Sequence, residues 1–236
     1  MEMTSARESV PFLLAVASDL EARAVCGGPA PAGRPWEPMP MASSAGRGLW
    51  ILVTGVGKAA AAGGVAHALS VRRFRGVISV GIAGSLPGPD APPLLSVVAA
   101  TAASFADDGI MTSAGLRDLA AAGFPPFASG GMASPAPLLD VLAPLATRTG
   151  VVATVSAGSG TDALAREVAE RTGAIAEGME GAAVALAAER LGVAWGELRV
   201  ISNTTGERSR QVWDLAGSLE ALGRVIGGLG TRLSEV

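Results

Sequence analysis

The chain has 236 residues, of which 49% are hydrophobic and 17% are charged, which is enough apolar material for one large core and predicts a single α/β domain over residues 1–236. Its formal net charge is -3 and it contains no Lys/Arg-rich block, which argues against nucleic acid and anionic membrane surfaces as partners and leaves small molecules as the expected ligands. The single cysteine, Cys26, has no partner for an internal disulfide, and the first ten residues lack the basic-then-apolar order of a secretory signal, so we expect a cytoplasmic protein.

Continuous apolar runs bounded by Gly, Ser or Thr are typical of buried parallel strands. Such runs occupy residues 12–17, 49–53, 77–80, 151–155 and 198–201. All are far shorter than the roughly 18 to 20 residues needed to cross a bilayer. Helix-like patterns at residues 59–69 and 162–171 lie between them, so strands and helices alternate. This alternation predicts a mainly parallel sheet with helices on both faces.

Three stretches rich in Gly and Pro, residues 27–41, 87–93 and 123–137, are predicted to be loops. Strand and helix patterns resume on both sides of each stretch, so we do not interpret them as domain linkers. The sequence contains no internal repeat and no heptad pattern.

Polar residues and glycines follow the predicted strands one after another. They are Glu21, residues 55–57, residues 81–84, residues 156–161 and Asn203. In an open parallel sheet the carboxyl ends of the strands face one crevice, where ligands bind. If the strands are parallel or suitably placed, these five segments form one site.

The segment Gly-Val-Gly-Lys at residues 55–58 differs from both common nucleotide-binding patterns. A phosphate loop has four residues between its first glycine and a Gly-Lys pair that Ser or Thr follows, whereas Ala59 follows this lysine. A dinucleotide fingerprint requires glycine at position 60, which is Ala60. Two interpretations remain, a tight turn between strand and helix or a backbone-lined floor of a pocket.

A longer helix is predicted over residues 177–191, with Gly192 in the left-handed position just past its end. Glu180 heads the apolar stripe of this helix, which continues through Ala183, Val184, Ala187 and Leu191. A carboxylate on a buried face needs a hydrogen-bond or ion-pair partner. Either Arg199 or backbone amides satisfy Glu180, or it binds ligand hydroxyls.

The remaining polar residues have ordinary structural explanations when taken singly. Glu21 is a first-turn acid that the helix dipole favours, Asn203 suits a turn, and the lone His67 suits a surface or packed position. With one His and one Cys, the sequence offers no Ser/His/Asp or Cys/His set and no metal-ligand cluster. We therefore predict no metal and no cofactor, and any hydrolysis would depend on carboxylates and amides.

Taken together, five segments occur in the order seen in one enzyme superfamily. They are residues 17–21, 53–58, 80–84, 178–183 and 199–203. Over residues 12–222 the chain resembles the purine nucleoside phosphorylase and nucleosidase superfamily, and within it the methylthioadenosine/S-adenosylhomocysteine nucleosidases. The resemblance implies a three-layer αβα sandwich around a mainly parallel, mixed sheet, a purine nucleoside ligand, no cofactor, and a homo-oligomer, dimer or higher, in which a neighbouring subunit completes the pocket.

The resemblance also implies a role for individual residues. Glu21 matches the glutamate that activates the attacking water, and Glu180 with Met179 matches the pair that holds the ribose. The other residues implied to contact the nucleoside are Ile82, Ala83 and Gly84 beside the ribose, Gly160 and Thr161 against the base, and Ser202 next to Asn203.

Asn203 occupies the position at which the adenine-specific nucleosidases carry an aspartate. An asparagine amide donates to N7 or O6 of a 6-oxopurine, so hypoxanthine or guanine is favoured over adenine. The segments at residues 179–183 and 199–208, followed by Trp213, resemble the futalosine hydrolase branch. That resemblance implies cleavage of futalosine to hypoxanthine and dehypoxanthinyl futalosine in menaquinone biosynthesis. Arg208 would bind the carboxylated 5′ arm, or else is a solvated loop residue.

Water is favoured over phosphate as the nucleophile, because a carboxylate at position 21 would repel a phosphate dianion. Three alternatives remain open on the sequence alone. They are a methylthioadenosine/S-adenosylhomocysteine-type nucleosidase, a purine nucleoside phosphorylase, and a nucleoside-binding protein without turnover.

Overall fold

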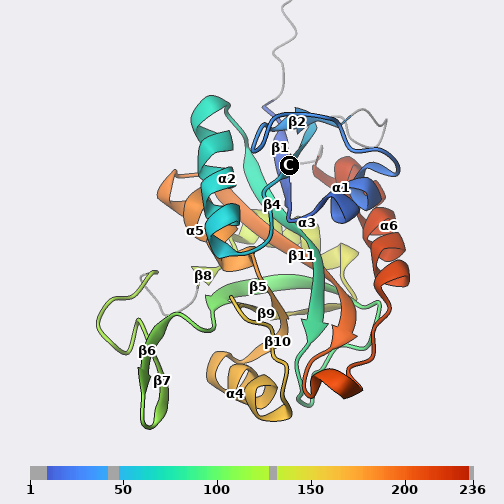
Figure 1. Ribbon diagram of the computed structural model, residues 1–236. Helices are drawn as coiled ribbons and strands as arrows, with labels where there is room; N and C mark the ends of the chain where they lie inside the picture. Colours follow the sequence, from blue (N-terminus) through green and yellow to red (C-terminus); the bar gives the residue numbers. More distant parts are fainter. Residues whose placement is uncertain (1–9, 42–47, 128–131, 234–236) are drawn as a thin grey trace, which may run out of the picture.

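The structure, a computed structural model, describes residues 10–41, 48–127 and 132–233. Within these residues the main feature is a mixed sheet with strand order β10-β9-β5-β11-β4-β1-β3-β2, to which β8 adds at β5 (Figure 1). The parallel group consists of β1 (Phe12–Val16), β3 (Leu49–Val53), β4 (Gly76–Ser85) and β11 (Ala194–Thr204). The opposite direction is taken by β5 (Val97–Phe105), β9 (Arg148–Thr154) and β10 (Ala174–Gly178).

One end of the sheet closes on itself. β10 pairs with β9 and also, in antiparallel fashion, with β4. Strands β4, β11, β5, β9 and β10 therefore form a small closed barrel, from which β1, β3 and β2 (Met39–Pro40) extend. β9 runs opposite to β1, β3, β4 and β11. Because the barrel closes through β10, the carboxyl end of β9 nevertheless lies near the carboxyl end of β4.

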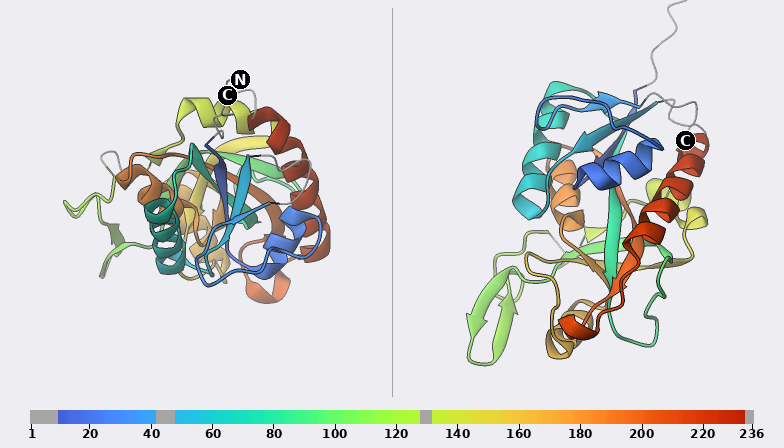
Figure 2. Two further views of the ribbon diagram at one scale, coloured as in Figure 1. Left: turned by 90° about the horizontal axis from the view of Figure 1, so that it is seen from above. Right: turned by 45° about the vertical axis from the view of Figure 1, so that its right-hand side comes forward.

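Helices cover both faces of the sheet, which confirms the predicted architecture (Figure 2). The helices α1 (Asp19–Cys26), α3 (Ala136–Leu142) and α6 (Leu215–Leu233) pack on one face, and α2 (Lys58–Val71) and α5 (Gly181–Arg190) on the other. The helix α4 (Asp162–Thr172) packs against β9 and β10. Successive strand residues point to opposite faces, so Leu14 contributes to the first core and Leu13 to the second.

The predicted strands are all present, although β4 and β11 extend well beyond residues 77–80 and 198–201. The predicted helix over residues 177–191 is wrong at its start, because Glu177 and Gly178 end β10 and α5 begins only at Gly181. The reason is the barrel closure, which pairs Glu177 with β4. Gly192, with φ 69°, occupies the predicted left-handed position.

Two predicted loops contain regular structure within their described residues. The stretch 27–41 ends in β2, and the stretch 123–137 includes β8 (Met132–Ala133) and the start of α3. A hairpin of β6 (Gly109–Thr112) and β7 (Gly115–Asp118) projects from the body of the molecule (Figure 1). Among the residues described, no helix has the length and apolar character required to traverse a membrane.

Candidate active site

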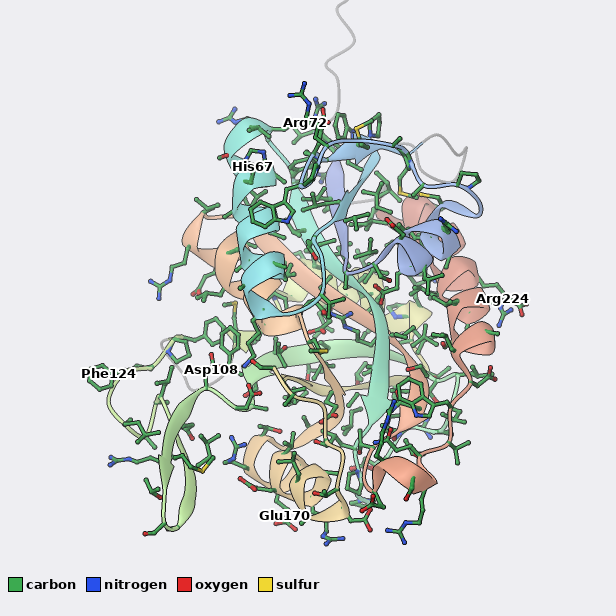
Figure 3. The ribbon with its side chains drawn as sticks, in the orientation of Figure 1. His67, Arg72, Asp108, Phe124, Glu170 and Arg224 are labelled. Carbon is green, nitrogen blue, oxygen red and sulfur yellow. The ribbon has the colours of Figure 1, made fainter. Side chains whose placement is uncertain are left out.

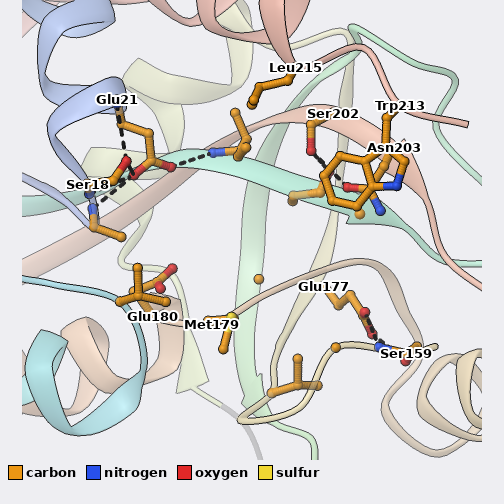
Figure 4. A pocket seen from close by; sticks show the side chains of 18 of the residues that line it. Ser18, Glu21, Ser159, Glu177, Met179, Glu180, Ser202, Asn203, Trp213 and Leu215 are labelled. Atoms are coloured by element: carbon orange, nitrogen blue, oxygen red, sulfur yellow. Dashed lines mark hydrogen bonds between the residues drawn. The ribbon is translucent and has the colours of Figure 1, made fainter. Parts of the chain in front are cut away.

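A cavity of about 510 Å³ opens where β1, β4, β10 and β11 meet (Figure 4), a size typical of small-molecule sites. All but one of the predicted site residues line it, namely Glu21, Ile82, Ala83, Gly84, Gly160, Met179, Glu180, Ser202, Asn203 and Arg208. The exception is Thr161, which is exposed and outside the lining; its hydroxyl caps α4 by accepting from the Leu164 amide. The lone His67 is exposed on α2 (Figure 3).

Glu21 is fixed by the turn that joins β1 to α1. Its Oε2 accepts hydrogen bonds from the Ala17 amide (3.0 Å), the Ser18 amide (3.1 Å) and the Ser18 hydroxyl (3.1 Å). The Ser18 hydroxyl in turn accepts from the Glu21 amide, which completes a capping box. Glu21 Oε1 accepts from the Ile82 amide of β4 at 3.0 Å. Glu21 is therefore the first-turn acid of α1 that was predicted, and the same hydrogen bonds hold its carboxylate at the cavity surface.

The space beside Glu21 depends on a glycine in β4. A Cβ at Gly81 would overlap both Glu21 Oε1 and Arg199 Nη1. The Glu21 carboxylate and the Arg199 guanidinium therefore both lie against the backbone of Gly81, which only a residue without a side chain permits.

Replacing Gly81 by Ala should displace Glu21 or Arg199 and lower kcat at least about 10-fold, because a misplacement of about 1 Å can cost a hundredfold in rate. The rate is measured as base release by chromatography, for the nucleoside cleavage that the family resemblance implies. Gly227→Ala is the matched control, since a Cβ there meets no atom within 4 Å. A Gly81→Ala enzyme as active as Gly227→Ala would contradict this role of Gly81.

Glu180 lies at the N-cap of α5 and heads the buried stripe of Ala183, Val184 and Ala187, whereas Leu191, which was predicted to continue the stripe, follows the helix and is exposed. Its Oε1 accepts from the Gly57 amide at 3.0 Å, and its Oε2 lies 3.8 Å from Arg199 Nη1. Gly57 has φ 94°, so the Gly-Val-Gly-Lys segment makes the tight turn expected of it, and Val56 of that turn also lines the cavity. Backbone and Arg199 satisfy Glu180, which nevertheless remains at the cavity surface.

A buried charge cluster lies behind the two carboxylates. Arg199 donates from Nε to Glu197 Oε1 (2.8 Å) and from Nη2 to the Ser79 hydroxyl (2.7 Å). Burial raises the pKa of Glu197, and the neighbouring Arg199 opposes this rise. Burial also lowers the pKa of Arg199, but Glu197, Glu180 and Glu21 outweigh that effect, so its net shift is upward. Arg199 is therefore a permanent cation that links these carboxylates.

Asn203 lies inside β11 and not after it, at a register shift between Ile201 and Asn203 in the pairing with β4. Its Oδ1 accepts from the Ser202 hydroxyl at 2.8 Å, and its Nδ2 donates to the Thr204 carbonyl at 3.0 Å. An amide nitrogen carries two hydrogens, so one N–H remains available to a ligand. The bulged strand, rather than a turn, presents this donor to the cavity.

Glu177, which was not among the predicted site residues, also lines the cavity. Its Oε1 accepts from the Ser159 amide at 2.7 Å and its Oε2 from the Ser159 hydroxyl at 2.6 Å. Burial raises the pKa of Glu177, whereas the two bonds from Ser159 favour its ionised form. A lone glutamate between Ala176 and Gly178 gave no helical or strand periodicity that marked it as part of a site.

The polar groups of the cavity divide into two ends (Figure 4). Glu21, Ser18 and Glu180 lie at one end, and Asn203, Ser202, Glu177 and Ser159 lie at the other, with Met179 between them. The first end can deprotonate a water and bind hydroxyls, since carboxylates are acceptors and bases. The second end combines an amide donor with a carboxylate acceptor, which suits the polar edge of a base.

Arg208 lies at the exposed mouth of the cavity. Its Nη1 donates to Gln211 Oε1 at 2.7 Å, and its guanidinium lies 4.9 Å from the centre of the Trp213 ring. The Arg208 side chain is therefore exposed to solvent and also held in place by Gln211 and Trp213, two further lining residues that were not among the predicted site residues.

Comparison with known proteins adds the family. A model of the phosphorylase superfamily matches residues 16–229. The futalosine hydrolase of Acidothermus cellulolyticus is 40% identical over 187 residues, which cover 76% of this chain and 74% of that protein. The chain belongs to the futalosine hydrolase family of that superfamily. A second futalosine hydrolase, from Streptomyces coelicolor, is 39% identical over 186 residues and covers 76% of this chain and 77% of its own length.

Solved structures confirm the fold of this family member. A mutant Helicobacter pylori MTAN with 5′-methylthioadenosine in its active site superimposes with a TM-score of 0.74 at 18% identity, covering 97% of this chain and 100% of the other. The native futalosine hydrolase of Helicobacter pylori gives a TM-score of 0.73 at 17% identity, covering 96% and 98%. The family model confirms the predicted superfamily, and the solved structures confirm its nucleoside phosphorylase-like fold.

Proposed function

We propose that this futalosine hydrolase family member hydrolyses the N-glycosidic bond of a 6-oxopurine nucleoside, with futalosine as substrate and hypoxanthine as leaving base. The observation that carries the proposal is the division of one cavity into a carboxylate end with Glu21 and Glu180 and an amide end with Asn203. Such an enzyme would serve menaquinone biosynthesis, as the resemblance to this family implies. With a single cysteine in the chain, a cytoplasmic location fits the proposal.

In the proposed reaction the bond between C1′ and N9 breaks and its electron pair passes to the purine. The sugar becomes oxocarbenium-like, and Glu21 takes a proton from a water whose oxygen forms the new bond to C1′. Glu180 accepts hydrogen bonds from the ribose hydroxyls and, with Glu21, stabilises the positive charge on the sugar. Met179, Ile82 and Ala83 line the space for the ribose.

The free N–H of Asn203 would donate to N7 of the departing purine, whose negative charge strengthens that hydrogen bond. Ser202 orients the amide, because its hydroxyl bonds to Asn203 Oδ1. The base then takes a proton from solvent and Glu21 releases the proton it took to solvent, so the sum of the reaction is nucleoside plus water giving sugar and purine.

Phosphate is a poor alternative to water in this cavity. Among the described residues of the lining, Arg208 is the single Lys or Arg, and it lies at the mouth. A phosphate beside C1′ would instead face Glu21 and Glu180, and like charges repel. The family resemblance implies that Arg208 binds the carboxylated 5′ arm of the substrate, and its contacts with Trp213 and Gly160 place it beside the Asn203 end of the cavity.

We also propose that the protein forms a homo-oligomer, a dimer or larger. The projecting β6–β7 hairpin carries the exposed side chains of Ile110 and Met111, and Phe124 close by is exposed too (Figure 3). Exposed apolar side chains that gather in one place are typical of protein contact sites. Analytical ultracentrifugation should therefore give a mass at least twice that of one chain.

A panel of nucleosides tests the proposed function. Purified enzyme is incubated with futalosine, inosine and methylthioadenosine in phosphate-free buffer, and released bases are separated by chromatography. We expect hypoxanthine from futalosine and little adenine from methylthioadenosine. Adenine as the main product, or base release that requires added phosphate, would overturn the proposal, and ligand binding without any release would indicate a binding protein.

A further inference from the structure

Three strands place Glu177 and Asn203 on either side of one glycine. Gly84 of β4 pairs with Glu177 of β10 on one side and with Asn203 of β11 on the other. Directly paired residues point to the same face of a sheet, and neighbouring strands lie about 4.8 Å apart. The two polar side chains therefore leave the same face, separated by one strand.

Gly84, which lies between Glu177 and Asn203 in the sheet, cannot be replaced by a residue with a side chain without a clash. A Cβ at Gly84 would lie 2.8 Å from Thr205 Cγ2 and 3.2 Å from Asn203 Nδ2. Gly84 therefore lets the Thr205 methyl group and the Asn203 amide lie against the backbone of β4, and Gly84, Asn203 and Glu177 all line the cavity. A flat ligand edge bound at this end of the cavity would meet the amide donor of Asn203 and the carboxylate of Glu177.

Glu177 is held ready to accept further hydrogen bonds. Each of its carboxylate oxygens accepts one bond from Ser159, and a carboxylate has about four acceptor sites. The loop that carries Ser159 is itself tied down, because Asp107 accepts from the Ser156 and Ala157 amides. This anchoring fixes the position of Glu177, as recognition of a particular ligand atom requires.

We propose that Glu177 accepts a hydrogen bond from N1–H of the purine, and that the pair of Glu177 and Asn203 selects 6-oxopurines. The inference rests on the proposed function and names a specificity-determining residue for it. A 6-oxopurine presents N7 and O6 as acceptors and N1–H as a donor, which complements the amide of Asn203 and the carboxylate of Glu177 in order along one edge. Adenine presents an acceptor at N1 and would face Glu177 with a lone pair.

The test is a Glu177→Gln variant, which keeps the shape and removes the charge. We expect kcat/KM for futalosine and inosine to fall about 10- to 100-fold, the range for one hydrogen bond to a charged group. For the 6-amino counterparts of these nucleosides kcat/KM should stay level or rise, because the amide can donate to N1 of adenine. Glu220→Gln, on the exposed side of α6, is the control and should match the parent enzyme.

Binding of the free bases gives a second readout that does not depend on turnover. Parent enzyme should bind hypoxanthine at least about 10-fold more tightly than 1-methylhypoxanthine, and Glu177→Gln should lose this difference in calorimetry. Equal losses for 6-oxo and 6-amino substrates, with the preference for hypoxanthine retained, would overturn the inference and leave Glu177 a structural residue. If the parent enzyme released no hypoxanthine at all, the proposed function itself would have failed.

Discussion

Replacing Glu21 by Gln should lower the turnover of futalosine by at least about 100-fold, the lower end of general acid-base effects. The introduced glutamine can keep the bonds from Ala17 and Ser18, but it cannot take a proton from water. Its amide would face the Ile82 amide that now donates to Glu21 Oε1, which should cost about 1 to 3 kcal/mol of stability. Initial rates of base release and thermal unfolding measure the two effects separately.

Asp19→Asn is the matched control for this experiment. Asp19 lies in the same first turn of α1 but is exposed and outside the cavity lining. It should keep the parent rate. A Glu21→Gln enzyme within about threefold of the parent would remove Glu21 from the mechanism, however well the variant folds.

Replacing Arg199 by Met should destabilise the protein by about 3 to 5 kcal/mol, because it leaves a buried charge without its partner. Glu197 is fully buried and Arg199 supplies its one hydrogen bond in the described structure; its Oε2 already has none. Urea unfolding followed by circular dichroism gives the free energy of unfolding. Activity should fall as well, since Arg199 lies beside both Glu21 and Glu180.

A double variant separates the unpaired charge from lost packing. Arg199→Met with Glu197→Met removes both charges and should recover part of the stability but not the activity. Arg224→Met, whose partner Glu220 is exposed, should change the urea midpoint little. If Arg199→Met unfolded at the parent midpoint, the buried cluster would have no structural importance.

The strands were predictable because both of their faces are buried, which makes each a continuous apolar run such as Phe12–Val16. The barrel was not, because it depends on the pairing of β10 with β4 between distant parts of the chain. The same pairing explains why the helix over residues 177–191 was started too early. Local pattern could not show that Glu177 ends a strand.

The site residues, like the strands, were predictable where they depend on local sequence and not where they depend on contacts between distant segments. Glu21 and Glu180 were identified by charge within apolar surroundings and by their resemblance to family segments, and both line the cavity. Glu177 could not be predicted, because its place in the site depends on its position beside Gly84 and Asn203. Two strand pairings, β10 with β4 and β11 with β4, set that position. Thr161 was selected with its segment, but its side chain turns to cap α4.

The fate of oxygen during cleavage of futalosine distinguishes hydrolysis from phosphorolysis. The enzyme is supplied with futalosine in phosphate-free water enriched in oxygen-18, and the sugar product is analysed by mass spectrometry. We predict free hypoxanthine and a sugar that carries one labelled oxygen from the attacking water. Absence of cleavage until phosphate is added, with a sugar phosphate as product, would instead show that the enzyme is a phosphorylase.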